Sequence, residues 1–172
     1  MDQRSERFGF TSRREGHTYI FELEFSDNQR LVAIVRRFVE EYYGALFTDE
    51  ETLSRLALVT HELMENAMRY SNGGMARLAV EYDPLLRRVW VRSFNQTSAQ
   101  HADAVGRLVE GLARAEDPMA LYVGLMRDTA SRAEGSGLGL ARIRVEAEME
   151  LSHRYQAGCL NITASAQIGG IQ

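Results

Sequence analysis

Two polar side chains in the middle of the chain, Glu62 and Asn66, have a spacing that suits catalysis. They lie in the segment HELMENAMRYS, residues 61–71, whose apolar residues recur at helical intervals. Residues four apart share one face of a helix, so both side chains point along the rim where this helix would border a pocket. A carboxylate can accept a proton or orient a nucleophile, and an Asn carbonyl oxygen suits Mg²⁺ that phosphates and water also hold. Taken alone, the pair is more typical of the solvated edge of an amphipathic helix.

A second candidate element is the glycine-rich loop Gly135–Gly139, in the segment EGSGLGLARI. Its glycines at positions 135, 137 and 139 permit positive φ angles and close backbone approach, and the loop leads into a helix whose N-terminus favours an anion. The segment is not a Rossmann fingerprint, because the third glycine of that motif falls on Leu140 or Arg142. It is not a P-loop either, because the chain contains no lysine. Taken alone, it is a glycine-rich turn.

Other chemistries suggested by single residues are less well supported. His61–Glu62 begins like the zinc-protease motif H-E-x-x-H, but Glu65 stands where the second histidine belongs. His61 could also be a phosphoacceptor, although the residues after it fit a nucleotide-binding segment better, and a packed or surface histidine is the simplest interpretation. The single cysteine, Cys159, is interpreted as a small core residue.

The periodicity of apolar residues predicts a fold in which a strand, two helices, a hairpin, a helical insert, a further helix and a closing hairpin follow one another. Residues 1–16 are predicted to be a loose lead-in and residues 17–172 a single domain. The expected elements are a strand at 18–25, helices at 29–46 and 48–70, a hairpin of 75–82 with 87–94, helices at 101–114 and 118–129, a helix from Leu138, and a hairpin of 151–155 with 159–166. This order indicates an α/β (α+β) fold, a two-layer sandwich with a mixed, mostly antiparallel sheet and helices on one face.

The apolar faces of the first two helices can be assigned from the same spacing. In the first, the predicted buried residues are Leu31, Ile34, Val35, Phe38 and Tyr42. In the second, they are Leu56, Val59, Leu63, Ala67 and Tyr70. Glu62 and Asn66 flank this second stripe, which makes residues 48–70 the most informative segment.

Composition narrows the classes of function. With 172 residues the chain suits one domain, and its net charge of −4 disfavours non-specific nucleic-acid binding. No apolar run is long enough to cross a bilayer, and the single cysteine excludes an intrachain disulfide. The expectation is a cytoplasmic protein that acts on neither membrane nor nucleic acid. All 20 basic residues are arginine, which removes every lysine-dependent mechanism.

Taken together and in this order, the two elements resemble those of the GHKL (histidine-kinase-like) ATPase superfamily. HELMENAMRYS resembles its N-box, including the basic–aromatic–Ser run that begins at Arg69, and GSGLGL resembles its second glycine box. The resemblance spans about residues 21–166 and implies a Bergerat-type ATPase fold that binds ATP and Mg²⁺. The chain departs from the superfamily after the middle hairpin, where VRSFNQTSAQ replaces the expected Asp-x-Gly-x-Gly box. In this it resembles the SiaB-type branch of the superfamily, which is grouped with the anti-sigma-factor serine kinases and whose kinases act on anti-sigma-antagonist-like proteins.

The resemblance also implies roles for individual residues. Glu62 would be the base or water-orienting carboxylate, Asn66 the Mg²⁺ ligand, and Ser93 or Asn95 the substitute for the missing adenine-binding Asp. Thr163 would lie beneath the adenine, and Arg127 or Arg132 would reach the terminal phosphate. The full set expected to bind the nucleotide is Asn66, Arg69, Ser93, Asn95, Arg127, Arg132, Gly135, Ser136, Gly137, Leu138, Gly139 and Thr163.

Three functions are compatible with these residues. The first is a kinase that phosphorylates a Ser or Thr of a small regulatory protein of the anti-sigma-antagonist type in a bacterial partner-switching pathway. The second is a non-catalytic, nucleotide-gated module that binds such a partner or a sigma factor. The third is a scaffold that no longer binds nucleotide. The presence of both Glu62 and Asn66 favours the kinase, and homodimerisation is a further expectation from related domains.

Overall fold

The computed structural model describes residues 8–26, 28–46, 49–72, 74–129 and 137–168, which form one sheet and five helices within these ranges. Each helix and strand expected between residues 18 and 166 is present, and each end agrees with the expected one or differs from it by at most two residues. Their bounds are β1 Phe8–Glu15, β2 Thr18–Phe25, α1 Gln29–Gly44, α2 Glu50–Arg69, β3 Ala76–Asp83, β4 Arg88–Gln96, α3 Ala99–Arg114, α4 Pro118–Thr129, α5 Leu138–Val145, β5 Glu150–Gln156 and β6 Cys159–Gln167.

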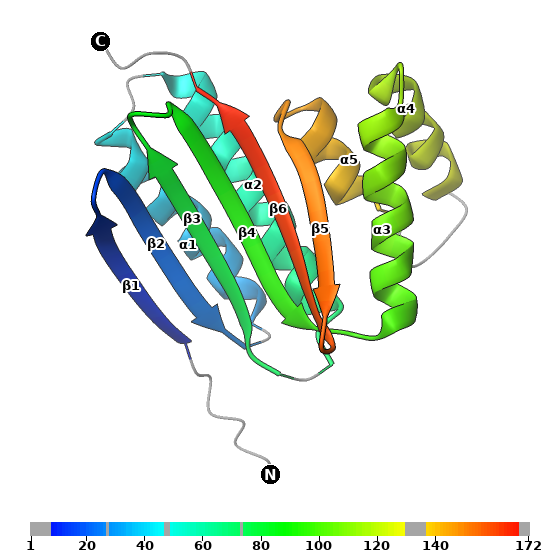
Figure 1. The fold of residues 1–172 in the computed structure, drawn as a ribbon, viewed down its shortest axis with the longest axis horizontal. Helices are drawn as coiled ribbons and strands as arrows, with labels where there is room; N and C mark the ends of the chain where they lie inside the picture. The colour runs from blue at the N-terminus through cyan, green and yellow to red at the C-terminus, as the bar shows by residue number, and fades with distance from the viewer. Residues whose placement is uncertain (1–7, 27, 47–48, 73, 130–136, 169–172) are drawn as a thin grey trace.

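The six strands form one open sheet in the order β1-β2-β3-β4-β6-β5, and each neighbouring pair is antiparallel. The predicted two-layer α/β sandwich is confirmed, but the described sheet is wholly antiparallel rather than mixed. Figure 1 shows the helices behind the sheet, with α1 and α2 across its middle and α3, α4 and α5 gathered near β5. The insert between β4 and β5 therefore lies beside the C-terminal half of the fold.

The core lies between the sheet and α1 and α2. Alternate residues of the central strands face it, so Phe21, Leu23 and Phe25 of β2 are buried while Glu24 between them is exposed. Four of the five residues predicted for the apolar stripe of α2 are fully buried, and Tyr70 lies beyond the end of the helix. Asp49 caps the start of α2 by accepting hydrogen bonds from the backbone N–H groups of Glu51 and Thr52. No helix in the described ranges is long and apolar enough to cross a membrane.

The prediction of a loose lead-in is wrong for Phe8–Glu15. This segment is strand β1, which pairs with β2 along its full length and forms the edge of the sheet. A turn at Gly16, whose φ is +60°, connects the two strands. The error has a physical reason, since the polar side chains of β1 give no alternating pattern and its hydrogen-bond partners lie in another strand.

The predicted face of α1 is partly wrong. Ile34 is 63% exposed, and the buried residues are instead Leu31, Val32, Val35, Val39 and Tyr43. Phe38 and Tyr42 form a second, half-buried row that meets β1: the ring centroids of Phe10 and Phe38 are 6.5 Å apart, and the Ser12 hydroxyl donates a 2.9 Å hydrogen bond to Tyr42. The helix is therefore rotated by about one residue from the position that the sequence pattern indicates.

Candidate functional site

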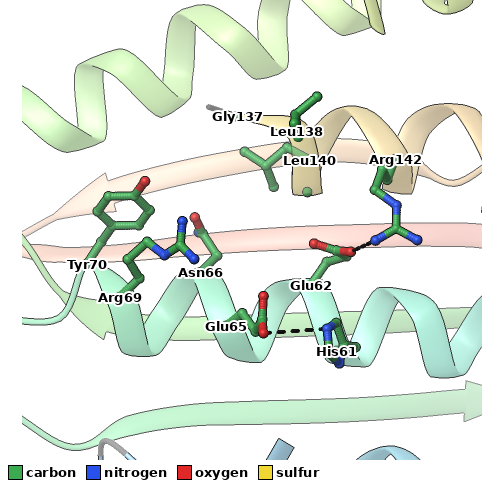
Figure 2. Close-up of a pocket in the computed structure, with 11 residues that line it drawn as sticks. His61, Glu62, Glu65, Asn66, Arg69, Tyr70, Gly137, Leu138, Leu140 and Arg142 are labelled. Carbon is green, nitrogen blue, oxygen red and sulfur yellow. Dashed lines mark hydrogen bonds and ion pairs between the residues drawn. The ribbon is translucent and has the colours of Figure 1, made fainter. Parts of the chain in front are cut away.

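A cavity of about 290 Å³ lies where the C-terminal half of α2 faces the first turns of α5. Figure 2 shows the side chains of α2 pointing across it towards α5, among them Glu62 and Asn66. Its lining residues are His61, Glu62, Glu65, Asn66, Arg69, Tyr70, Gly137, Leu138, Gly139, Leu140 and Arg142. Two segments that are about 70 residues apart in the chain thus form one polar pocket.

The N-terminus of α5 borders this pocket. Gly137 caps the helix in a left-handed conformation, with φ +63° and ψ +4°, and has no side chain that could bond to the backbone N–H groups of the first turn. Such groups carry a partial positive charge and are a common binding site for phosphate oxygens. The positive φ favours glycine at position 137, and a Cβ there would displace Cδ2 of the Leu108 side chain of α3.

Glu62 is held against α5 by two contacts. Its Oε2 occupies the space that a Cβ on Gly139 would need, and its Oε1 accepts a hydrogen bond from the Arg142 guanidinium. The residue is only 8% exposed. Burial raises the pKa of the Glu62 carboxyl. The positive charges of Arg142 and His61 oppose that rise, whereas the negative charges of Glu65 and Glu146 add to it.

Arg142 connects Glu62 to a second helix of the insert. Its Nε and Nη2 lie 3.2–3.3 Å from the carboxylate of Glu146, one helical turn further along α5. The Tyr122 hydroxyl of α4 donates a 2.8 Å hydrogen bond to the same carboxylate. The hydrogen bond from Arg142 is the main cause of a lowered pKa at Glu146. Helices α4, α5 and α2 are therefore joined by one chain of polar contacts.

Asn66, Ser93 and Asn95 each have buried polar atoms with no hydrogen-bond partner among the described residues. These atoms are Nδ2 of Asn66, Oγ of Ser93 and both amide atoms of Asn95. Buried polar groups in native proteins are nearly always bonded to protein, water or ligand, and leaving one unpaired costs about 1–3 kcal/mol. Water or a ligand that reaches these atoms would therefore be bound favourably.

The sheet brings Ser93 and Asn95 beneath the C-terminal half of α2. The backbone N–H of Asn72, just after α2, bonds to the carbonyl of Gln96 at the end of β4 over 2.9 Å, so the two elements end together. Measured back from this shared end, with a rise of about 1.5 Å per helical residue and about 3.4 Å per strand residue, Asn66 and Ser93 each lie about 9–10 Å away, and Asn95 lies about 3 Å away. Ser93 and Asn95 face the helices, because Val89 and Val91 at the same parity are fully buried.

The far end of the pocket is closed by aromatic and charged groups. Tyr70 stacks on His101 at the start of α3, with ring centroids 3.9 Å apart and an interplanar angle of 20°. Burial lowers the pKa of His101. On α2, His61 Nε2 lies 3.6 Å from the Glu65 carboxylate. Arg69 lies one turn beyond Glu65 and supplies a cation to the wall.

Of the ten predicted site residues that the structure describes, six line one cavity and four do not. Glu62, Asn66, Arg69, Gly137, Leu138 and Gly139 all line the cavity. Ser93 and Asn95 lie beneath α2, buried and outside the cavity wall. Arg127 is exposed near the end of α4 and is not a lining residue. Arg132, Gly135 and Ser136 lie outside the described residues.

The placement of Thr163 beneath an adenine needs correction. In the register of β4 and β6 it pairs with Arg92, and its hydroxyl donates a 3.0 Å hydrogen bond to Asn161. The core-facing residues of β6 are Leu160, Ile162 and Ala164, so Thr163 lies on the face of the sheet that points away from the helices and the pocket. A shift of one residue along a strand moves a side chain to the other face of the sheet. The sequence alone did not settle on which face Thr163 lies.

Arg142 is not among the site residues that the sequence predicts. The sequence pattern marks this position only as one where the third glycine of a Rossmann motif is absent. Arg142 is three residues after Gly139 and so shares the face of α5 that meets Glu62. That spacing could have identified it, but only with the knowledge that Gly139 packs against Glu62.

The residues at the pocket fit the phosphate end of a nucleotide with its Mg²⁺. The N-terminal turn of α5 and the arginines of the wall suit phosphate oxygens, and Asn66 offers one amide oxygen. Across the described part of the chain, no group of three His, Cys, Asp or Glu side chains could hold a metal ion. Mg²⁺ here would therefore be held mainly by the phosphates, with Asn66 as the ligand from the protein.

Comparisons with known proteins agree with this description at the level of fold. No protein-family model matches the sequence, and no curated protein matches it either. A chain in the crystal structure of the SiaB–SiaC complex from Pseudomonas aeruginosa is similar to this chain with a TM-score of 0.63 over 83% of this chain and 88% of that one, at 16% identity. The resemblance to the SiaB-type branch, which was based on the missing Asp-x-Gly-x-Gly box, is thus matched by a structural neighbour, and what the two chains share at this identity is the fold.

Proposed function

We propose that the chain is an ATP- and Mg²⁺-dependent protein kinase that phosphorylates a Ser or Thr of a small regulatory protein of the anti-sigma-antagonist type, in the cytoplasm of a bacterium that uses partner switching. The observation that carries the proposal is the meeting of Glu62, Asn66 and Arg69 with the glycine-containing N-terminus of α5 across one cavity. The similarity to a chain of the SiaB–SiaC complex, an assembly of two proteins, supports a protein partner.

The residues of the pocket divide the work of phosphoryl transfer. The backbone N–H groups after Gly137 would hold phosphate oxygens, Asn66 would hold the metal, and Arg69 would add positive charge near the phosphates. Glu62 would accept the proton of the attacking hydroxyl, which its raised pKa favours. Bound Mg·ATP supplies the phosphoryl group. Ser93 and Asn95, whose polar atoms lack partners, would contact the base directly or through water.

A thermal melt with and without Mg²⁺ and ATP or ADP tests the binding part of the proposal. Ligand at 100 times its Kd adds about 2.7 kcal/mol, which for a domain of this size raises Tm by roughly 5–10 °C. Asn66→Ala should remove the Mg²⁺-dependent part of the shift. Asn161→Ala is a matched control, because Asn161 lies on the opposite face of the sheet, where it accepts the Thr163 hydrogen bond. No shift at millimolar nucleotide would refute ATP binding.

Phosphate transfer to a purified partner of the anti-sigma-antagonist type, followed with labelled ATP, tests the catalytic part. Positioned proton transfer contributes roughly 10²–10⁴-fold, so Glu62→Gln should reduce transfer by that factor while leaving the nucleotide-dependent melt unchanged. Glu41→Gln on the exposed side of α1 is the matched control. Transfer that survives Glu62→Gln would contradict the role of Glu62.

A non-catalytic module that binds an antagonist-type protein or a sigma factor is the second candidate. Two observations favour it: Ser93 and Asn95 lie outside the cavity wall, and Arg142 already engages the Glu62 carboxylate. A nucleotide-gated module would show partner affinity that changes with nucleotide and is unaffected by Glu62→Gln. A nucleotide-free module would bind its partner equally well after Asn66→Ala. Sedimentation of the chain alone and with its partner would show in the same experiments whether it forms a homodimer.

A further inference from the structure

The carboxylate of Glu62 does not stand free in the pocket. Oε1 is bonded to Arg142 and Oε2 is pressed against the backbone of Gly139, so both oxygens are engaged by α5. The orientation of this carboxylate is therefore decided by where α5 lies and where the Arg142 guanidinium points (Figure 2).

Arg142 is itself fixed by a second carboxylate. Its guanidinium has a planar fork of donors, and two sides of that fork are used: Nη1 on Glu62, and Nε with Nη2 on Glu146. A lysine at this position would provide the charge without the fork. Because Glu146 is only one helical turn from Arg142, this ion pair by itself does not connect α5 to any other element.

Tyr122 adds the connection to α4. Its hydroxyl bonds to Oε1 of Glu146, the same oxygen that accepts from Arg142 Nε at 3.2 Å. Tyr122 is half-buried and packs against the core, so its hydroxyl is directed by α4 rather than by solvent. A displacement of α4 relative to α5 would break this bond first and would leave Arg142 with a less restrained partner.

We propose that Arg142 is the positioning residue of Glu62, and that Tyr122 of α4 holds Arg142 in place through Glu146. The contact chain from Tyr122 to Glu62 joins the helical insert to the carboxylate in the pocket, so a protein or ligand that moves α4 changes the state of Glu62. The geometry stands independently of any activity, whereas the consequence for catalysis rests on the proposed kinase function.

Among the described residues, four charged groups act on the Glu62 carboxyl. They are His61 and Glu65 on α2, Arg142 on α5 and Glu146 at the end of α5, with Tyr122 of α4 acting through Glu146. Arg142 opposes the effect of burial on Glu62 and is the largest influence that does so. Removing the guanidinium should therefore make the carboxylate hold its proton more tightly.

The test is an NMR titration of the Glu62 side-chain carboxyl carbon in the full chain, assigned with Glu62→Gln. Arg142→Gln should raise the titration midpoint by about one pH unit or more, a tenfold change in proton affinity. Tyr122→Phe should raise it by a smaller amount, and Arg142→Lys should fall between the wild type and Arg142→Gln. Arg144→Gln is the matched control, since Arg144 is on the same helix but lines a different cavity, with Arg88 and Glu150.

A midpoint in Arg142→Gln that equals the midpoint in Arg144→Gln would overturn the proposal. Should Arg142→Gln fail to fold, Tyr122→Phe decides the matter, because it removes one hydroxyl: a midpoint above that of the control supports the proposal, and one equal to it overturns it. The titration needs no nucleotide and no partner, so it can succeed even if the kinase function is wrong. Where transfer is measurable, the acidic limb of its pH profile should move by the same amount in Arg142→Gln.

Discussion

Replacing Gly137 with alanine is the sharpest test of how the N-terminus of α5 is built. Gly137 has φ +63°, and an L-residue in this left-handed region costs roughly 1–2 kcal/mol. The added Cβ would also meet Cδ2 of Leu108, a side-chain end that can shift at a smaller cost. The expected loss of stability is therefore about 1–2 kcal/mol or slightly more. For a domain of this size that lowers Tm by roughly 2–8 °C.

Gly111→Ala is the matched control for this substitution. Gly111 lies within α3, and a Cβ there would meet nothing within 4 Å. Alanine in a helix interior is favoured over glycine by roughly 0.5–1 kcal/mol, so this variant should melt above the wild type. Both substitutions restrict the unfolded chain equally, so the difference between their Tm values reports the native conformation alone. A Gly137→Ala variant that melts as high as Gly111→Ala would refute the left-handed cap.

Three further outcomes can be checked by melts of single variants. Burial raises the pKa of Glu62 above its ordinary value of 4.5, so the native state binds the proton of this carboxyl more tightly than the unfolded chain does. The unfolding free energy of the wild type, relative to that of Glu62→Gln, should therefore fall as pH rises from about 4.5 through the raised pKa. Denaturant melts between pH 4 and 8 measure this difference, and an increase with pH would contradict it. Tyr43→Phe removes a buried hydrogen bond of 2.9 Å to the carbonyl of Val80 and should cost about 1 kcal/mol in the same type of melt. Leu63→Ala in the core should cost about 2–5 kcal/mol of stability. Leu85 is 69% exposed, so Leu85→Ala should change stability by less than about 0.5 kcal/mol, and equal effects of the two substitutions would mean that α2 packs differently.

The sequence by itself predicted the elements whose signals are local. Helix α2 was recognisable from its apolar spacing and from Asp49 before it, and the hairpin of β3 and β4 from two apolar runs around Asp83 and a proline. The same holds for Glu62 and Asn66, since residues four apart on a helix share a face whatever the rest of the chain does. The glycine box could be located for a similar reason, because a left-handed Gly137 at the start of a helix is a local requirement.

Only the tertiary structure decided features that depend on segments far apart in the chain. Strand β1 exists because its backbone pairs with β2, and the exposure of Ile34 depends on how α1 packs against the rest of the fold. Thr163 points away from the pocket because of the register between β4 and β6. The ion pair of Glu62 with Arg142 joins residues that are 80 positions apart. Periodicity reports which face of an element is apolar, whereas the partner of a side chain depends on packing between elements, and that is decided only when the whole chain folds.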